Sequence, residues 1–295
     1  MIDVKGLTLQ YPSKKGVFDL DFSVKQGEVM GYLGPNGAGK TTTIRALMGF
    51  MKPDSGNCTI GGLDCFTSAP KIQKTLGYIP GEIAFVEGMN GDEYLRFISE
   101  MRGTKDLSRQ RKLLEMFELS PKGSIKKFSK GMKQKLGIVA AFMHDPEVLI
   151  LDEPTSGLDP LMQNRFVELI LSEKANGKTI LMSSHIFEEV ERTCDNVLII
   201  KEGRIISQSD IDTLKSSQRK GFVIKTKDTA HAAQIFKNAG FELGEVDKNS
   251  VEVFVTGESI DKFGKTIGQI TLLGLDAKSQ TLEDIFMHYY AREGK

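Results

Sequence analysis

The sequence predicts an α/β fold built on a mostly parallel sheet, with antiparallel strands near the N-terminus, an all-helical insert and a small α+β C-terminal domain. Strand and helix patterns alternate along the chain, which is typical of a parallel sheet covered by helices. Residues 148–151 and 179–183 form largely apolar runs, as expected for strands that are buried on both faces. A glycine-rich loop at 34–42 also stands between a strand pattern at 28–33 and a helix pattern at 40–49.

This loop matches the phosphate-binding pattern G-x-x-x-x-G-K-[ST] and lies in the strand–loop–helix context that the pattern requires. Its glycines let successive backbone N–H groups turn around a polyphosphate, and the helix N-terminus adds a partial positive charge. Lys40 is expected to reach the β- and γ-phosphates, and the Thr41 hydroxyl to hold Mg²⁺. A glycine-rich turn with a chance lysine is the weaker alternative. The predicted nucleotide-binding residues of the loop are Gly34, Pro35, Asn36, Gly37, Ala38, Gly39, Lys40, Thr41 and Thr42.

The composition is that of an ordinary globular protein. Lys+Arg and Asp+Glu number 39 each, so the net charge is zero and nucleic acid is not expected as a partner. Cys58, Cys65 and Cys194 cannot all pair and lack metal-site spacing, which indicates a reducing compartment. Residues 1–5 start a strand rather than a signal peptide, and no apolar run approaches the ~20 residues of a membrane helix. We therefore expect a soluble protein, which leaves docking onto a membrane partner open.

The remaining elements up to about residue 215 follow from local patterns. Apolar residues at helical spacing between 90 and 143 predict the all-helical insert. Pro160 is expected to start a helix that Gly177 ends. Further strands are expected at 7–11, 17–24, 57–60 and 77–80, and a hairpin at 197–207.

The last part of the chain has a pattern of its own. Residues 213–220 are polar and are interpreted as a linker, which places a first domain at 1–215 and an accessory domain at 216–295. Strands at 221–226, 241–246, 251–255 and 270–275, with helices at 229–239 and about 260–267, give the order βαββαβ. That order is compatible with a ferredoxin-like module. A last helix is expected to begin at Thr281.

Acidic residues and a histidine follow two of the buried strands. Asp152 ends the apolar run and can bind Mg²⁺ directly or through water, while Glu153 is placed to polarise an attacking water. His185 follows the next strand, where a donor would stabilise charge that develops on a γ-phosphate. A strand that simply exits into a polar loop is the alternative for the acids, and a structural role is the alternative for His185. The phosphate loop upstream favours the catalytic interpretation of Lys40, Glu153 and His185.

Taken in order, the segments GPNGAGKTT, FSKGM, LILDEP, SGLD and SSH closely resemble the motifs of the ATP-binding-cassette ATPases of transporters. The resemblance covers about residues 1–215. It implies a P-loop NTPase cassette that binds ATP with Mg²⁺ and forms a head-to-tail dimer with two ATP molecules at the interface. The phosphate loop of one chain would face Ser129, Gly131 and Asp159 of the other. Tyr11 would stack on adenine; otherwise it is an edge-strand tyrosine.

Two motifs depart from the family pattern. The signature Leu-Ser-Gly-Gly-Gln is changed at Phe128, Lys130 and Met132, while Ser129 and Gly131 remain. Lys130 either adds a cation near a phosphate or belongs to the solvated basic run at 126–135; the sequence favours neither. The usual glutamine after Pro80 is replaced by Gly81-Glu82, so Glu82 is expected to bind the metal in its place.

The function expected from this resemblance is that of a soluble ATPase subunit at the cytoplasmic face of a separately encoded membrane permease. The family docks that partner at a segment corresponding to 82–101, and the segment 280–286 resembles the ending of exporter-type subunits. The second ATPase chain of the dimer is either identical or different. An ATPase acting on ribosomes or DNA usually carries two cassettes or a coiled coil, neither of which is present in this sequence. A non-hydrolysing regulatory cassette is a further alternative, against which Glu153 and His185 argue.

Overall fold

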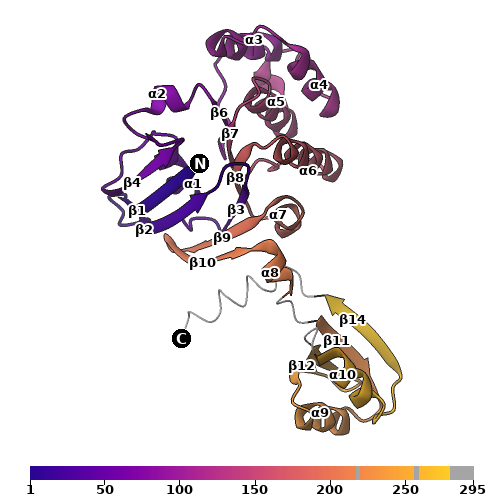
Figure 1. Cartoon of the computed structure of the whole chain (residues 1–295). Coiled ribbons are helices and arrows are strands. Elements are labelled where there is room, and N and C mark those ends of the chain that lie inside the picture. Colours follow the sequence, from indigo (N-terminus) through magenta and orange to yellow (C-terminus); the bar gives the residue numbers. More distant parts are fainter. Residues whose placement is uncertain (217–219, 256–258, 280–295) are drawn as a thin grey trace. The chain divides into compact units, whose positions relative to one another are not determined.

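The computed structural model describes residues 1–216, 220–255 and 259–279. The chain divides into two compact units, Met1–Asp210 and Ile211–Lys295 (Figure 1). Whether the second unit acts as an accessory domain stays a prediction. None of the described helices is both long and apolar enough to cross a bilayer.

A six-stranded sheet forms the centre of the larger unit and confirms the predicted α/β fold. Its order is β10-β9-β3-β8-β7-β6, and all neighbours are parallel except the β9–β10 hairpin. Every residue of β3, β7 and β8 is buried, which explains their apolar sequences. The strands are β3 Val29–Leu33, β6 Leu76–Ile79, β7 Val148–Asp152, β8 Thr179–Ser184, β9 Asn196–Lys201 and β10 Arg204–Asp210.

The register of this sheet brings the predicted motifs together. Leu33, which precedes the phosphate loop, pairs with Ser184, which precedes His185. Asp152 pairs with Ser183 of the same neighbouring strand. Because parallel strands end at one edge of a sheet, three segments far apart in the sequence converge there.

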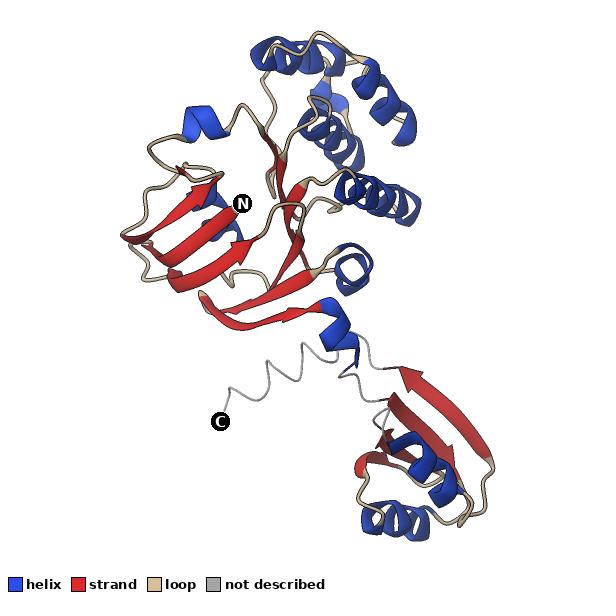
Figure 2. Cartoon of the chain, viewed as in Figure 1, coloured by secondary structure: helices blue, strands red, loops and turns tan. Residues whose placement is uncertain are grey.

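A four-stranded antiparallel sheet, with the order β2-β1-β4-β5, stands beside the central sheet (Figure 2). Residues 1–5 and 7–11 are not two strands, because β1 continues through a register shift between Val4 and Leu7. Side chains of both sheets and of the helix after the phosphate loop share one hydrophobic core, including the fully buried Leu20, Tyr32 and Ile44. The strands are β1 Ile2–Gln10, β2 Gly16–Val24, β4 Ser55–Ile60 and β5 Leu63–Asp64.

The helical insert is confirmed at its predicted place. Its first helix begins at a capping box, in which Asn90 Oδ1 accepts from the Glu93 N–H at 2.9 Å and Glu93 Oε2 accepts from the Asn90 N–H at 2.8 Å. Gly103, at a φ of 67°, ends it. The insert contains α3 Gly91–Arg102, α4 Ser108–Met116 and α5 Lys130–Phe142; the other helices of this unit are α1 Lys40–Leu47, α2 Ala69–Ile72, α6 Pro160–Ala175 and α7 Phe187–Thr193.

The smaller unit has the predicted βαββαβ order. Its antiparallel sheet, in the order β12-β13-β11-β14, packs Ile224 and Val253 against Phe236 and Phe263 of its two helices. This is the split βαβ arrangement of ferredoxin-like modules. The elements are β11 Lys220–Lys225, α9 Thr229–Asn238, β12 Glu242–Val246, β13 Ser250–Val255, α10 Ile260–Ile267 and β14 Gly274–Ser279.

Two expectations for this part of the chain were wrong. Residues 213–216 of the predicted linker belong to a helix, α8 Ile211–Ser216, which buries Ile211 and Leu214, an i,i+3 apolar pair among polar neighbours. The strand predicted at 270–275 starts only at Gly274, where pairing with Lys225 of β11 begins. Residues 271–273 form no regular structure, although the Leu273 N–H donates to the Lys225 carbonyl at 2.8 Å. The helix predicted from Thr281 lies outside the described residues.

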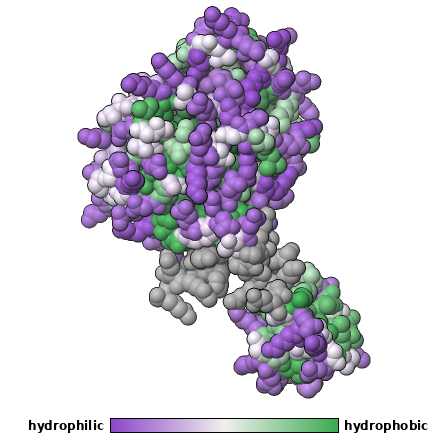
Figure 3. Space-filling model, in the orientation of Figure 1, coloured by the Kyte–Doolittle hydropathy of each residue, from purple (hydrophilic) through white to green (hydrophobic). Residues whose placement is uncertain are grey.

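On the face shown in Figure 3, the larger unit is mostly hydrophilic with small apolar areas, and the smaller unit also has an apolar area. Leu273 is 58% exposed and Leu272 and Leu275 are about 40% exposed, all near the start of β14.

Candidate functional site

The phosphate loop has the backbone that its glycines predict. Gly37 and Gly39 adopt φ values of 81° and 116°, which favour glycine. A Cβ at Gly39 would also come within 2.7 Å of the Val17 side chain. The loop passes directly into α1, whose N-terminus begins at Lys40. The first N–H groups of the helix therefore face the loop, ready for an anion.

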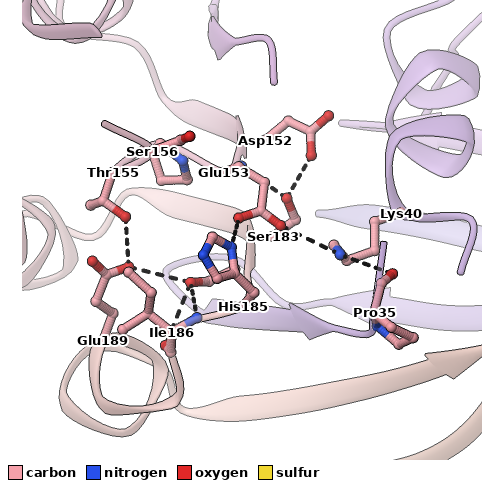
Figure 4. Close-up of polar contacts among 12 residues, drawn as sticks. Pro35, Lys40, Asp152, Glu153, Thr155, Ser156, Ser183, His185, Ile186 and Glu189 are labelled. Carbon is pink, nitrogen blue, oxygen red and sulfur yellow. Dashed lines mark hydrogen bonds and ion pairs between the residues drawn. The ribbon is translucent and has the colours of Figure 1, made fainter. Parts of the chain in front are cut away.

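Lys40 connects this loop to the acidic strand end. Its side chain is only 6% exposed, and its Nζ donates to the Gly34 carbonyl at 2.6 Å and to the Pro35 carbonyl at 3.4 Å. The same Nζ lies 3.4 Å from Glu153 Oε1 (Figure 4). The lysine is thus held at the place where the resemblance expects the β- and γ-phosphates, with Glu153 as its counter-charge.

Asp152 is fully buried and its two oxygens have separate donors. The Thr41 hydroxyl donates to Oδ2 at 2.8 Å, and the Ser183 hydroxyl donates to Oδ1 at 2.6 Å. The Ser183 Oγ in turn accepts from the Glu153 N–H at 3.0 Å. The phosphate-loop threonine, β7 and β8 are therefore joined through one carboxylate.

Glu153 and His185 form a contact pair. Each oxygen of Glu153 has one charged or titratable neighbour, since Oε1 faces Lys40 and Oε2 accepts a hydrogen bond from His185 Nδ1–H (Figure 4). Glu153 has a φ of 50°, a conformation that costs a non-glycine residue energy and turns the chain sharply after Asp152. His185 is 60% exposed, so its ring stands at the surface of the site.

A cleft of about 300 Å³ opens beside these groups, at the lower end of the range of small-molecule pockets. Glu153, Tyr11 and most of the phosphate loop line it, whereas Gly34 and Ala38 are buried below. Tyr11 follows β1, is half-buried and donates its hydroxyl to Met51 Sδ at 3.3 Å. The loop residues that line the cleft are Pro35, Asn36, Gly37, Gly39, Lys40, Thr41 and Thr42.

Besides Gly34 and Ala38, three further predicted binding residues do not line this cleft. Ser129 caps α5 by accepting from the Met132 N–H at 3.2 Å, and Asp159 caps α6 by accepting from the Met162 N–H at 3.0 Å. Gly131 lies against the loop before α6, because a Cβ there would come within 2.9 Å of the Gly157 carbonyl. The signature segment and the SGLD segment thus contact each other, outside the cleft of their own chain.

Lys130 is exposed, as expected for a residue of the basic run, and a role near a phosphate stays a prediction. Its Nζ donates to Ser156 Oγ at 3.0 Å, and its aliphatic carbons lie where a Cβ at Gly157 would clash, at 2.9 to 3.1 Å. The side chain therefore fastens the signature segment to the SGLD segment.

Glu82 stands beside the metal-site candidate without contacting it. A Cβ at the preceding Gly81 would come within 3.1 Å of Asp152 Oδ2, so the backbone passes close to that carboxylate. The Glu82 side chain is exposed.

The sequence missed four hydroxyl and carboxyl groups behind the site: Ser183, Ser184, Thr155 and Glu189. All four are at least 95% buried. Burial raises the pKa of Glu189, although hydrogen bonds from Thr155 and Ser184 oppose the shift. The sequence signal for Ser183 and Ser184 was their place as polar residues at the end of an otherwise apolar strand. No comparable feature of the neighbouring sequence indicates Thr155 or Glu189.

Comparison with known proteins decides the family. A family profile described as ABC transporter matches residues 17–156. The bacitracin transport ATP-binding protein BcrA of Bacillus licheniformis is 35% identical over 296 residues, which cover 99% of this chain and 96% of that protein. This chain belongs to the ABC transporter family. It is an ATP-binding subunit of the family, and the resemblance seen in the sequence motifs is confirmed.

Other relatives agree with this assignment. The linearmycin resistance ATP-binding protein LnrL of Bacillus subtilis (strain 168) is 32% identical over 310 residues, covering 99% of each chain. A solved structure titled as the ATP binding subunit of an ABC transporter has a TM-score of 0.67 and 34% identity, over 73% of this chain and 92% of that one. A dimeric cassette, MJ0796, solved with ADP and Pi, shares the fold with a TM-score of 0.65 at 20% identity, over 72% of this chain and 99% of that one.

Proposed function

We propose that this ABC ATPase hydrolyses ATP with Lys40, Glu153 and His185 as its catalytic residues. The observation that carries the proposal is the Lys40–Glu153–His185 series of contacts at the edge of the cleft. Lys40 binds the β- and γ-phosphates, Glu153 accepts a proton from the attacking water, and His185 donates to the γ-phosphate.

The contact between Lys40 and Glu153 suggests how the base is controlled. While the cleft holds no phosphate, the ammonium group neutralises Glu153. Phosphate oxygens compete for Lys40 once ATP binds, because they carry more charge and meet the loop N–H groups as well. Glu153 Oε1 then loses its cation and can accept a proton from water.

The groups around Asp152 fit Mg²⁺. Thr41 and Asp152 present a hydroxyl and a carboxylate, the hard oxygen ligands that this ion prefers, within 2.8 Å of each other. They would hold the ion, which neutralises charge on the β- and γ-phosphates. Glu82 is proposed as a further ligand in place of the family's glutamine.

A second ATPase chain, identical or different, completes the site in this proposal. Ser129, Gly131 and Asp159 lie outside the cleft of their own chain, and Lys130 joins the signature segment to the SGLD segment through Ser156. They are therefore available to the ATP of a partner chain, while Tyr11 at the mouth of the cleft stacks on adenine.

Export is the proposed direction of transport. BcrA is named for bacitracin transport and LnrL for linearmycin resistance, and each aligns with 99% of this chain. The chain would act at the inner face of the cell membrane, bound to a separately encoded permease and not to nucleic acid. A groove of about 500 Å³ supports docking after Glu82; Phe85, Val86, Met89 and Ile125 are among the residues that line it.

Co-purification tests this assignment. We expect the chain to remain with a membrane-spanning partner in detergent-solubilised membranes. Val86→Asp should release it without changing ATP affinity, because a charged side chain would replace one of the apolar side chains that line the groove. Leu171→Asp is the matched control, since Leu171 has a similar exposure, 42% against 45%, but lies on α6. Sedimentation with ribosomes, or retention of both variants, contradicts the proposal.

Replacing Glu82 tests its role at the metal. Glu82→Ala should lower Mg²⁺-dependent hydrolysis by about tenfold, the effect of ~1.4 kcal/mol, and leave ATP affinity unchanged. Glu87→Ala, at another exposed position of the same segment, serves as the control in the isolated protein. If Glu82→Ala hydrolyses ATP at the parental rate across a Mg²⁺ titration, Glu82 is not a ligand.

A further inference from the structure

Glu189 is a buried carboxylate close to the catalytic residues that the mechanism above does not use. It lies on α7, the helix after His185, and is only 4% exposed. Burying a carboxylate costs free energy unless hydrogen bonds or an opposite charge replace the water that it loses. Its contacts are therefore informative.

One oxygen of Glu189 joins two catalytic segments. Oε2 accepts a hydrogen bond from the Thr155 hydroxyl at 3.0 Å (Figure 4). It accepts another from the Ser184 hydroxyl at 3.3 Å. Thr155 comes two residues after Glu153, and Ser184 immediately precedes His185. Oε1 is buried and has no hydrogen-bond partner among the described residues.

The hydrogen bond from Ser184 is connected to the turn that carries the histidine. Ser184 Oγ also accepts from the Ile186 N–H at 2.9 Å, so the serine spans the turn that carries His185. The Ser184 hydroxyl lies within hydrogen-bond distance of two acceptors, Glu189 Oε2 at 3.3 Å and the Ile186 carbonyl at 3.5 Å, of which the carboxyl oxygen is the nearer. Its oxygen keeps lone pairs for the Ile186 N–H. Through Ser184, Glu189 thus contributes to the orientation of the turn that carries His185.

From these contacts we infer that Glu189 is a positioning residue, which fixes Glu153 and His185 relative to each other through Thr155 and Ser184. The inference rests on the proposed roles of Glu153 and His185. The catalytic pair itself meets through a single contact between two side chains, one of which is 60% exposed. Glu189 supplies the rigid connection that this contact lacks, between the loop after β7 and the turn after β8.

A pair of substitutions separates positioning from simple packing. Glu189→Gln keeps an oxygen that accepts from both hydroxyls, whereas Glu189→Leu keeps the volume and removes the acceptor. We expect the leucine variant to lower kcat by about 10–100-fold, since a misplacement of ~1 Å can cost 10²-fold. The glutamine variant should stay within about fivefold of the parent. Both should bind ATP with the parental Kd, because neither changes the phosphate loop.

The control is Glu188, the neighbouring residue on α7, whose side chain is 80% exposed. Glu188→Gln and Glu188→Leu should leave kcat and Kd unchanged. Glu153→Gln in the same assay tests the proposed function separately. If this variant hydrolyses ATP normally, the proposed catalytic role of Glu153 is wrong, whatever the Glu189 variants do.

Three results would overturn the inference: parental kcat in Glu189→Leu, an equal loss in both Glu189 variants, or a loss of ATP affinity that matches the loss of kcat. If the leucine variant does not fold, Thr155→Val decides, because it is isosteric and removes one of the two donors. It should lower kcat by about fivefold or more at unchanged Kd; an unchanged kcat counts against the positioning role.

Discussion

Lys40→Ala should nearly abolish ATP binding. The ammonium group is expected to make charge-assisted hydrogen bonds to the β- and γ-phosphates, each worth about 1.5–3 kcal/mol. Losing two of them costs about 3–6 kcal/mol, so Kd should rise by roughly 10²–10⁴-fold. Titration calorimetry with Mg-ATP measures this directly. An unchanged affinity would refute the assignment of the phosphate loop.

The variant needs a control, because Lys40 also has partners in the protein. It holds the Gly34 and Pro35 carbonyls and neutralises Glu153, so its removal could disturb the loop. Thermal unfolding distinguishes the two effects, since a lost phosphate contact leaves the melting temperature without nucleotide unchanged. Lys71→Ala removes an equal charge from an exposed position on α2 and should bind ATP normally.

The fold was predictable where short-range sequence features determine it. The buried strands β7 and β8 are recognisable in the sequence as apolar runs, and the capping box at Asn90 marks the start of the helical insert. Short elements such as α2, α7 and β5 gave no such signal, because too few residues are available to show a period. The helix α8 was missed for a related reason, since its buried face consists of Ile211 and Leu214 alone.

The site was predictable as a set of motifs but not as a network. Lys40, Asp152 and Glu153 each stand in a recognisable segment, and the common edge of a parallel sheet brings such segments together. Which hydroxyl meets which carboxylate depends on the strand order, in which β8 lies between β3 and β7. That order cannot be read from the chain, so the Ser183 bridge to Asp152 and the Glu189 bridge to Thr155 appeared only in the structure.

Glu153→Gln should abolish most hydrolysis while it preserves the shape of the site. The amide has the size of the carboxylate and its oxygen can still accept from His185, but it cannot take a proton from water. General-base catalysis typically contributes about 10²–10⁴-fold, so kcat should fall by roughly that factor. The control is Glu147→Gln, an exposed glutamate immediately before β7, which should hydrolyse ATP at the parental rate.

The same substitution should also trap a closed dimer. Removing the charge of Glu153 relieves its repulsion with the γ-phosphate, and without hydrolysis the ATP that favours the closed state is not consumed. A ligand shifts a conformational equilibrium by its differential affinity for the two states, so bound ATP should hold two variant chains together. Light scattering with and without Mg-ATP would then show a doubled mass for Glu153→Gln and not for the parent. Near-normal hydrolysis by the variant would instead show that another residue is the general base, and His185, in contact with Glu153, would be the first candidate.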